Sequence, residues 1–237
     1  MTKPIHSKRP KAILFDLDDT LWPIGPVIVQ AEITLHDWLA NHAPGVAQQF
    51  SIAALRQHRL DLLTRQPELQ HDLGALRRAG LLSAFEQTGE DINKVEAAML
   101  HFFAARNAVT PYADVLPGLL RLKDKILLGS ISNGNADLEV IGLAHHFKVS
   151  LAASEFGSAK PDAAIFHAAC VSLGVLPHEA VYVGDDLLLD VVGAQQAGLR
   201  AVWLNRAGAQ RDADIHPDAI CATFDELLDW LERQREE

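Results

Sequence analysis

Five short apolar runs, separated by longer stretches with helical periodicity, constrain the fold of this chain more than any other feature. The runs are rich in valine, isoleucine and leucine and cover residues 12–15, 126–131, 149–152, 180–183 and 201–204. Amphipathic spacing predicts helices over residues 117–125, 136–143, 162–173, 189–197 and 224–235. Parallel strands need a crossover connection, which is usually a helix. The alternation therefore predicts a parallel β-sheet with helices packed on it, an α/β fold.

The segment between the first two runs, residues 21–111, has a different pattern. Apolar residues recur there at helical spacing, and none of its stretches alternates as a strand would. We therefore expect two domains, a core of residues 1–20 and 112–237 and an inserted, all-helical cap of residues 21–111. Because the cap follows the carboxyl end of the first strand, it enters the chain at the edge where parallel α/β sheets bind ligands.

The composition narrows the location and the partners of the chain. Its 237 residues carry a formal net charge of -10, which argues against nucleic acid and anionic membranes, because both need a clustered basic surface. Cys170 and Cys221 are the only cysteines and lack the spacing of a metal site or a disulfide framework. The polar residues 1–11 argue against a secretory signal, and no segment has the roughly 20 apolar residues of a membrane span. We expect a cytoplasmic protein.

Acidic residues follow two of the apolar runs. Asp16 and Asp18 follow the first run, and Asp185, Asp186 and Asp190 follow the fourth. Two like charges about 4 Å apart repel by roughly 4 kcal/mol at an effective dielectric constant near 20, so such a cluster either protonates or binds a cation. Oxygen-rich acidic sites suit Mg²⁺. We expect Asp185 to be a metal ligand and Asp190 to hold a metal-bound water or to orient Lys160. Asp186 either coordinates through solvent or caps the following helix.

Two further segments carry groups that bind anions. Ser132, Asn133 and Gly134 close the second apolar run, and Lys160 precedes a proline at the start of a predicted helix. The Ser132 hydroxyl can donate to a phosphoryl oxygen, and the amides of Asn133 and Gly134 can form a small anion nest. Each motif alone is also typical of an ordinary turn or an exposed lysine. Together, a nucleophile, a metal, anion donors and a cation indicate phosphoryl transfer.

The spacing of Asp16 and Asp18 suits a division of labour. Residues two apart on an extended segment project to the same side, so both carboxyl groups can face one pocket. Asp16 would attack phosphorus and form an aspartyl-phosphate. Asp18 would protonate the departing alcohol and later remove a proton from the hydrolytic water. Asp18 must then hold a proton at the working pH, which nearby carboxylates and partial burial favour.

These motifs resemble those of phosphatases of the haloacid dehalogenase superfamily, and the resemblance spans nearly the whole chain. The four motifs of the superfamily fall on Asp16, Asp18 and Thr20, on Ser132, on Lys160, and on Asp185, Asp186 and Asp190. The resemblance implies a Rossmann-like core with a helical cap inserted after the first motif. It also implies that Mg²⁺ is bound by the side chains of Asp16 and Asp185 and by the backbone carbonyl of Asp18.

Within that superfamily, the sequence around these motifs resembles that of bacterial phosphatases of FMN and of the riboflavin precursor 5-amino-6-(5-phospho-D-ribitylamino)uracil. The shared segments are Phe-Asp-Leu-Asp-Asp-Thr-Leu, which begins at Phe15, Asn-Gly-Asn-Ala, which begins at Asn133, Ser-x-Lys-Pro, which begins at Ser158, and Val-Gly-Asp-Asp-Leu, which begins at Val183. Core motifs report the reaction more directly than the substrate. We therefore expect a small phosphorylated metabolite as the substrate, with a flavin phosphate as the leading candidate.

The cap should determine specificity, because its inward face would close over the leaving group. Residues 21–113 contain seven lysines and arginines and nine acidic residues, so a second phosphate site is possible but not indicated. Trp38, Phe102 and Phe103 could stack on a ring but at helical spacing are more typical of a core. The cap histidines lack metal-ligand spacing and are expected on the surface or in packing; they are His36, His42, His58, His71 and His101.

Three other functions use similar residues. A haloacid dehalogenase uses an aspartate nucleophile on the same scaffold but needs neither Mg²⁺ nor a second acid, so Asp18 and Asp185 argue against it. A phosphomutase differs mainly in whether water or a sugar accepts the phosphoryl group, and it stays open. A phospho-accepting signalling domain combines acidic residues, Mg²⁺, a hydroxyl and a lysine, but lacks a helical insertion of this size.

Overall fold

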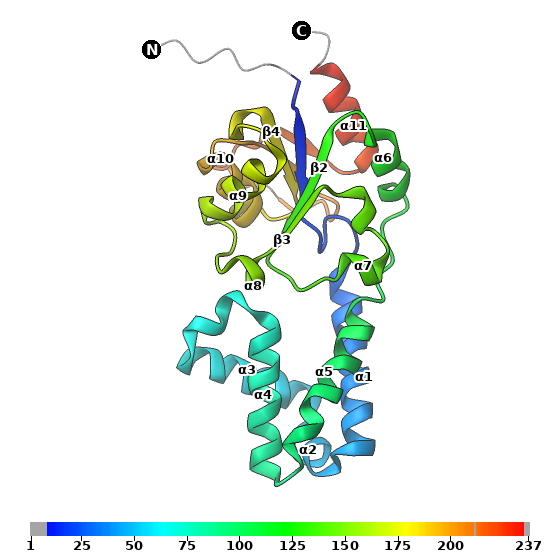
Figure 1. Cartoon of the computed structure of the whole chain (residues 1–237), viewed down its shortest axis with the longest axis vertical. Coiled ribbons are helices and arrows are strands. Elements are labelled where there is room, and N and C mark those ends of the chain that lie inside the picture. The colour runs from blue at the N-terminus through cyan, green and yellow to red at the C-terminus, as the bar shows by residue number, and fades with distance from the viewer. Residues whose placement is uncertain (1–8, 211, 235–237) are drawn as a thin grey trace. The chain divides into compact units, whose positions relative to one another are not determined.

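The computed structural model of the chain describes residues 9–210 and 212–234, which pack as two units (Figure 1). The first unit contains the residues up to Pro23, residues 110–133 and those from Gly142 onward. The second contains residues 24–109 and 134–141. Residues 1–8, which include most of the polar start, and the predicted helix end at Arg235 lie outside the described residues. The domain boundaries drawn from the sequence stay a prediction.

A six-stranded sheet lies at the centre of the first unit, with the strands in the order β3-β2-β1-β4-β5-β6. The strands are β1 (Ala12–Phe15), β2 (Leu127–Ser132), β3 (Val149–Ala152), β4 (Ala180–Gly184), β5 (Arg200–Leu204) and β6 (Ala219–Cys221). All neighbouring pairs are parallel, so the predicted α/β fold is confirmed. The strand order reverses between β1 and β4, which is the kind of switch point where ligands bind in such sheets.

The strands agree closely with the apolar runs, with one omission. β1 and β3 have the predicted bounds, β4 and β5 are each one residue longer than the predicted run, and β2 is shifted by one residue at both ends. β6 was not predicted, because its three residues are too few to show a pattern and Ile220 within it is half exposed.

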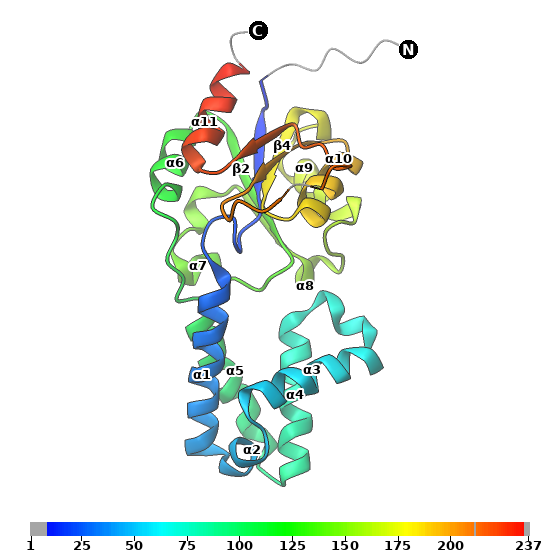
Figure 2. The ribbon, with the colours of Figure 1, turned by 180° about the vertical axis from the view of Figure 1, so that it is seen from behind.

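Helices pack on both faces of the sheet (Figures 1 and 2). They are α6 (Val115–Leu122), α8 (Ala153–Phe156), α9 (Ala163–Leu173), α10 (Gly193–Gln196) and α11 (Phe224–Arg233), with short turns at Ala144–His146 and Pro177–Glu179. The predicted helix over 189–197 is divided between a π-helical turn, Leu187–Val192, and α10. On one face, Phe166 of α9 and Ala194 of α10 share an apolar cluster with Tyr182 of β4. On the other face, the ring of Phe224 stacks on Phe15 of β1.

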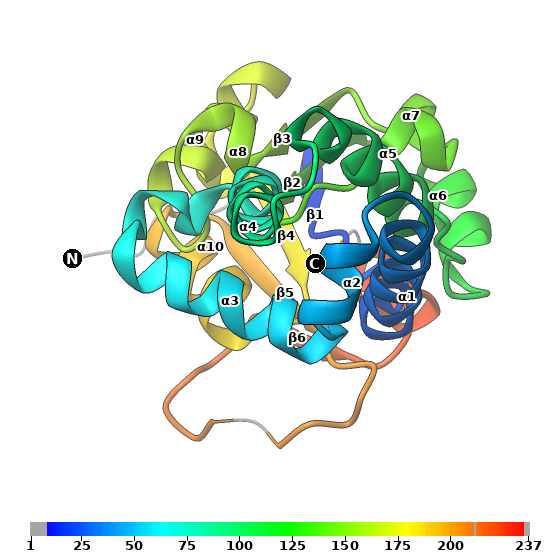
Figure 3. The same ribbon diagram turned by 90° about the horizontal axis from the view of Figure 1, so that it is seen from below.

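All the regular secondary structure in the described residues of the second unit is helical, as predicted for the insertion. Its helices are α1 (Ile24–His42), α2 (Pro44–Gln49), α3 (Ile52–Arg65), α4 (Leu73–Thr88), α5 (Val95–Arg106) and α7 (Leu138–Ile141), with short turns at Pro67–His71 and Ile92–Lys94. α1 lies alongside α5 (Figure 3). Phe102 is buried in the apolar core of this unit, and Trp38 and Phe103 pack against that core. None of the helices in the described part of the chain has the length and apolar character needed to cross a bilayer.

Three arginines of the second unit surround the buried carboxylate of Glu32. Glu32 of α1 pairs with Arg56, accepts a hydrogen bond from Arg59 at 2.7 Å and lies 3.7 Å from Arg77. Although burial opposes the effect, these arginines lower the pKa of Glu32. Arg77 also lies over the ring of Phe102, 3.6 Å from its centroid. Part of the near balance of charge seen in the sequence is therefore an ion cluster within this unit.

Gly118 of α6 leaves no room for a side chain, because a Cβ there would lie 2.1 Å from the ring of Phe224. We expect Gly118→Ala to lower the free energy of unfolding by roughly 1–3 kcal/mol. The displaced ring stacks on Phe15, and this strain outweighs the gain of about 1 kcal/mol that alanine has over glycine in a helix. Thermal unfolding followed by circular dichroism measures the loss. Gly25→Ala is the control, because nothing lies within 4 Å of a Cβ there, and equal losses in both variants would contradict this packing.

Candidate active site

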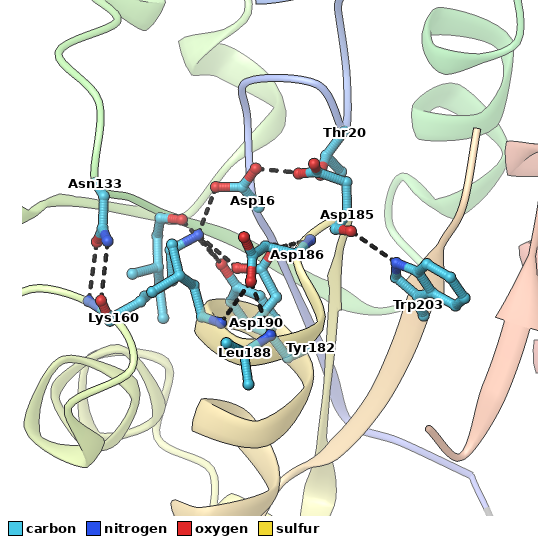
Figure 4. A network of polar contacts seen from close by, with 12 residues as sticks. Asp16, Thr20, Asn133, Lys160, Tyr182, Asp185, Asp186, Leu188, Asp190 and Trp203 are labelled. Carbon is cyan, nitrogen blue, oxygen red and sulfur yellow. Dashed lines mark hydrogen bonds and ion pairs between the residues drawn. The ribbon is translucent and has the colours of Figure 1, made fainter. Parts of the chain in front are cut away.

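Two aspartates follow the carboxyl ends of the adjacent strands β1 and β4 (Figure 4). The strands pair in parallel, with Phe15 opposite Val183. The backbone N–H of Asp16 donates to the carbonyl of Val183 at 2.9 Å, which extends the pairing by one residue. Asp185 comes directly after Gly184, the last residue of β4. Strand pairing thus brings Asp16 and Asp185 to the same edge of the sheet.

Thr20 links these two carboxylates (Figure 4). Its Oγ1 lies 3.1 Å from Oδ2 of Asp16 and 3.2 Å from Oδ1 of Asp185. A hydroxyl has one proton, so it donates to one carboxylate at a time. Thr20 is fully buried, which fixes this link inside the unit.

Lys160 places a positive charge against Asp16. Its Nζ donates to Oδ1 of Asp16 at 2.5 Å, to Oδ1 of Asp190 at 2.7 Å and to the Tyr182 hydroxyl at 2.9 Å. These three acceptors match the three protons of an ammonium group. The Tyr182 hydroxyl donates in turn to the carbonyl of Ile131 at 3.0 Å. Only 3% of the Lys160 side chain is exposed, so solvent screens these contacts little.

Asn133 fixes the backbone of Lys160 (Figure 4). Its side-chain Nδ2 donates to the carbonyl of Lys160 at 2.9 Å, and its Oδ1 accepts from the N–H of Lys160 at 2.9 Å. Ser132, the last residue of β2, is buried beside it in the chain. The sequence did not predict this pair of side-chain hydrogen bonds. The binding of phosphate by Ser132 and by the backbone amide of Asn133 stays a prediction.

The π-helical turn after β4 directs Asp190 back toward Lys160. The carboxylate of Asp186 accepts hydrogen bonds from the N–H groups of Leu188 and Leu189, so Asp186 caps the turn, one of the two roles open from the sequence. Oδ2 of Asp190 accepts from the N–H of Asp186 at 2.9 Å. A Cβ on Gly184 would lie 2.2 Å from Oδ2 of Asp190, so only glycine fits there. The bond from Lys160 to Asp190 agrees with the orienting role considered for Asp190.

Asp18 lies on a tight loop after β1 and is partly exposed. The indole N–H of Trp22 donates to Oδ1 of Asp18 at 2.8 Å, and the N–H of Asp19 donates to the carbonyl of Trp22 at 2.7 Å. Asp19 has a φ of 59°, in the left-handed region that asparagine and aspartate adopt more readily than most residues. The loop therefore orients the Asp18 carboxyl group through Trp22.

Three side chains around these residues were not predicted from the sequence. Tyr182 lies within an apolar strand, so the sequence predicts a core residue, and only its hydroxyl contacts Lys160. The sequence also predicts a core residue at Trp203 of β5, yet its indole N–H donates to the carbonyl of Asp185 at 2.6 Å. Arg206 donates to the carbonyl of Thr20 at 2.9 Å and to the carboxylate of Asp114 at 3.0 Å. Its position two residues beyond β5, at the ligand-binding edge, was the available signal.

A pocket of about 450 Å³ adjoins Asp185. Its lining includes Asp19, Tyr112, Asn205 and Arg206. The guanidinium of Arg206 lies over the ring of Tyr112, 4.2 Å from its centroid. The pocket gives small molecules access to the Asp185 carboxylate within the first unit.

The carboxylates at this edge outnumber the cation that they surround. Burial raises the pKa of Asp16 well above its usual range, and Asp190 and Asp185 add to this effect while Lys160 opposes it. Burial and the charge of Asp190 raise the pKa of Asp185 to about 6. Lys160 stays charged, because Asp16 and Asp190 raise its pKa more than burial lowers it. A second positive charge would therefore stabilise the ionised carboxylates.

The carboxylate cluster fits a divalent cation. Asp16, Asp185 and Asp190 each offer an oxygen, and these oxygens lie within 4.8 Å of one another. Mg²⁺ prefers such oxygen ligands, and its charge would offset the repulsion that raises the carboxyl pKa values. Asp190 was not among the metal ligands predicted from the sequence, and both of its oxygens already accept hydrogen bonds. Asp16 and Asp185 are the common members of the predicted set and the observed cluster.

The fold and this cluster define an α/β enzyme with a carboxylate-rich site at the switch point of its sheet. The chain belongs to the haloacid dehalogenase-like hydrolase family, whose model matches residues 10–198. The superfamily predicted from the sequence motifs is thus confirmed, as is the prediction that the chain is an enzyme.

Similar proteins include both phosphatases and dehalogenases. The chain is 32% identical over 200 residues to the 5-amino-6-(5-phospho-D-ribitylamino)uracil phosphatase YigB of Escherichia coli (strain K12), a match covering 83% of this chain and 84% of that protein. It is 31% identical to a glyceraldehyde 3-phosphate phosphatase of Methanopyrus kandleri, over 92% of this chain and 96% of that protein. A 2-haloacid dehalogenase structure from Pseudomonas syringae pv. Tomato DC3000 has a TM-score of 0.89 and 40% identity, covering 94% of this chain and 99% of that one.

The raised pKa of Asp185 predicts how the stability of the metal-free protein depends on pH. Its folded-state pKa of about 6 lies above the unfolded value of about 3.9, so its contribution to stability is present below about pH 4 and is lost as the pH rises through 6. Asp185→Asn removes this titration. We expect the free energy of unfolding of the variant, minus that of the wild type, to increase by about 2 kcal/mol between about pH 4 and pH 7, allowing for partial screening by solvent. Urea unfolding in EDTA measures this difference, and a difference that does not change with pH would contradict it.

Proposed function

We propose that the chain is a Mg²⁺-dependent phosphomonoester hydrolase that acts on a small phosphorylated metabolite through an aspartyl-phosphate. The observation that carries this proposal is the position of the Asp16 carboxylate, 2.5 Å from the buried Lys160 ammonium and linked through Thr20 to Asp185. A nucleophile beside a fixed cation suits phosphoryl transfer, in which the charge on the phosphoryl oxygens must be neutralised. Phosphatase activity is also supported by the relatives that are named as phosphatases.

Asp16 and Asp18 have successive roles in this proposal. A carboxylate oxygen of Asp16 attacks phosphorus and the ester P–O bond breaks, while Asp18 gives its proton to the departing alcohol oxygen. Asp18 then takes a proton from water, whose oxygen attacks the aspartyl-phosphate. The bond between phosphorus and the Asp16 oxygen breaks, inorganic phosphate leaves and the carboxylate is restored. The hydrogen bond from Trp22 to Asp18 supports this role, since it fixes the direction of the acid.

The remaining residues bind the phosphoryl group and the metal. We assign phosphate binding to Ser132, Asn133 and Lys160. The proposed ligands of Mg²⁺ are the side chains of Asp16 and Asp185 and the backbone carbonyl of Asp18, with Thr20, Asp186 and Asp190 in support. When bound, Mg²⁺ neutralises charge on the phosphoryl oxygens. Asp190 supports catalysis by holding the Lys160 ammonium at 2.7 Å, so that the cation stays directed at Asp16.

The substrate that we propose is a flavin phosphate or a related intermediate of riboflavin synthesis. The support comes from the sequence of the motifs and from the relative named 5-amino-6-(5-phospho-D-ribitylamino)uracil phosphatase, which aligns with 83% of this chain. Other relatives are named for glyceraldehyde 3-phosphate and phosphoserine. The shared chemistry is a monoester of phosphate on a small molecule.

Carbon–halogen hydrolysis is the second candidate, because the similar structure from Pseudomonas syringae, at 40% identity, is named a 2-haloacid dehalogenase. In that reaction Asp16 would attack carbon and displace halide, and no cation would be needed beside Asp185. The raised pKa of Asp185 favours the phosphatase, because a site built without a metal gains nothing from burying this extra carboxylate.

Substitution of the two loop aspartates tests the covalent mechanism. We expect Asp16→Asn to lower phosphatase activity by roughly 10⁴-fold or more, because an amide is a poor nucleophile. Asp18→Asn should retain the nucleophile but slow hydrolysis of the aspartyl-phosphate, so that mass spectrometry of acid-quenched enzyme detects phosphate on Asp16. Asp229→Asn is the control, since Asp229 is exposed on α11 and does not line the pocket beside Asp185. Undiminished activity of Asp16→Asn would refute the covalent step.

A substrate panel separates the two candidate reactions. We expect release of inorganic phosphate from FMN that stops in EDTA and returns with Mg²⁺, because two ionised carboxylates must be neutralised. Halide release from 2-haloacids is measured in parallel without Mg²⁺. Phosphate release from sugar phosphates alone would contradict the flavin substrate, whereas metal-independent halide release without phosphatase activity would contradict the proposed function itself.

A further inference from the structure

A second hollow in the first unit lies at the opposite edge of the sheet from Asp16. It has a volume of about 740 Å³ and is lined by residues that precede β1, β2 and β3 and by the first two residues of β2. Its cationic lining consists of Arg9, Lys11, Lys123, Lys125 and Lys148, and we call this site the basic hollow. Lys11 comes directly before β1, whereas Asp16 follows it directly. At about 3.3 Å per residue, the two edges are roughly 15 Å apart, so the basic hollow is separate from the active site.

The charge of the basic hollow is opposite to that of the whole chain. The chain carries a net charge of -10, yet five lysines and arginines line this one hollow. Asp124 is the acidic residue in its lining, and Glu179 neutralises Lys11 at 2.6 Å from just outside it. A surplus of positive charge gathered in a concave surface raises the local concentration of anions.

The turn between α6 and β2 presents two of these cations. Lys123 and Lys125 flank Asp124, which has a φ of 61°, and their backbone N–H groups donate to the carbonyls of Leu119 and Leu122. The side chains of Lys123 and Lys125 are exposed. The turn is thus anchored through its backbone, while its lysine side chains remain available to a ligand.

The basic hollow also contains a buried nitrogen atom, in His146, that lacks a hydrogen-bond partner among the described residues. His146 lines the basic hollow, and the atom is its Nδ1. Its ring lies 4.0 Å from that of His145. Burial lowers the pKa of His146, and the charges of His145 and Lys123 lower it further. These cations disfavour the protonated ring of His146, and an anion that enters the basic hollow would stabilise it.

We propose that the basic hollow is a second ligand site, which binds a small, multiply charged anion bearing phosphate groups. Phosphate oxygens accept hydrogen bonds from several lysines at once, and the volume of the hollow exceeds that of a single phosphate ion. The ligand would contact Lys123, Lys125 and Lys148, with His146 at the wall. This site is independent of the proposed hydrolysis, because none of its residues belongs to the active site.

Pyrophosphate is the probe, and the ring signals of His146 in NMR spectra are the local readout. We expect pyrophosphate to shift these signals in a saturable way and to raise the pKa of His146, because a bound anion favours the protonated ring. The double variant Lys123→Gln, Lys125→Gln should weaken this binding roughly tenfold at about 0.1 M salt. The signals of His146 are identified as those missing from the spectrum of His146→Gln. This measurement does not depend on hydrolysis of a substrate.

The control is the double variant Arg65→Gln, Arg78→Gln, which removes the same charge from exposed positions of α3 and α4. It should bind pyrophosphate as the wild type does. Unchanged binding by the lysine variant would overturn the proposal, as would equal shifts of His146 with sodium chloride at matched ionic strength. Tighter binding of a single-stranded oligonucleotide with the same lysine dependence would assign the hollow to nucleic acid and would also overturn it.

Discussion

The ion cluster around the Lys160 ammonium is the interaction on which the rest of the site depends. Lys160 lies 2.5 Å from Asp16 and 2.7 Å from Asp190, with all three side chains buried. At an effective dielectric constant near 20, each of these contacts is worth roughly 6 kcal/mol of Coulomb energy, which offsets only part of the cost of removing the charges from water, since the pKa of Asp16 is still raised. The cluster joins the loop after β1, the segment before α9 and the turn after β4. It thereby fixes Asp16 between one permanent cation and the Asp185 carboxylate.

Much of the fold follows directly from the sequence, because buried parallel strands are continuous apolar runs with few alternatives. Residues 12–15 and 201–204 illustrate this, since each is an unbroken apolar run that is fully buried. The acidic residues at the ends of β1 and β4 were predictable for the same reason, as the strand ends fix their place. β6 was not, because three residues at the sheet edge carry too little pattern.

The parts of the site that escaped prediction depend on side-chain direction. Asn133 was singled out for its backbone amide, but it is its side chain that clamps Lys160. Tyr182 sits within an apolar run, and only the packed structure reveals that its hydroxyl joins Lys160 to Ile131. Asp190 reaches Lys160 through a π-helical turn, a local geometry that residue spacing does not encode. The fold itself is shared by proteins named for different reactions, so the chemistry has to be argued from these side chains.

Whether Asp16 and Asp185 hold one divalent ion is the central question, and anomalous diffraction from crystals grown with Mn²⁺ answers it most directly. We expect one strong anomalous peak in contact with the carboxylates of both residues, close to Thr20, with Lys160 still bonded to Asp190. A peak bound elsewhere, or the absence of any peak beside Asp16 in crystals saturated with Mn²⁺, would contradict it.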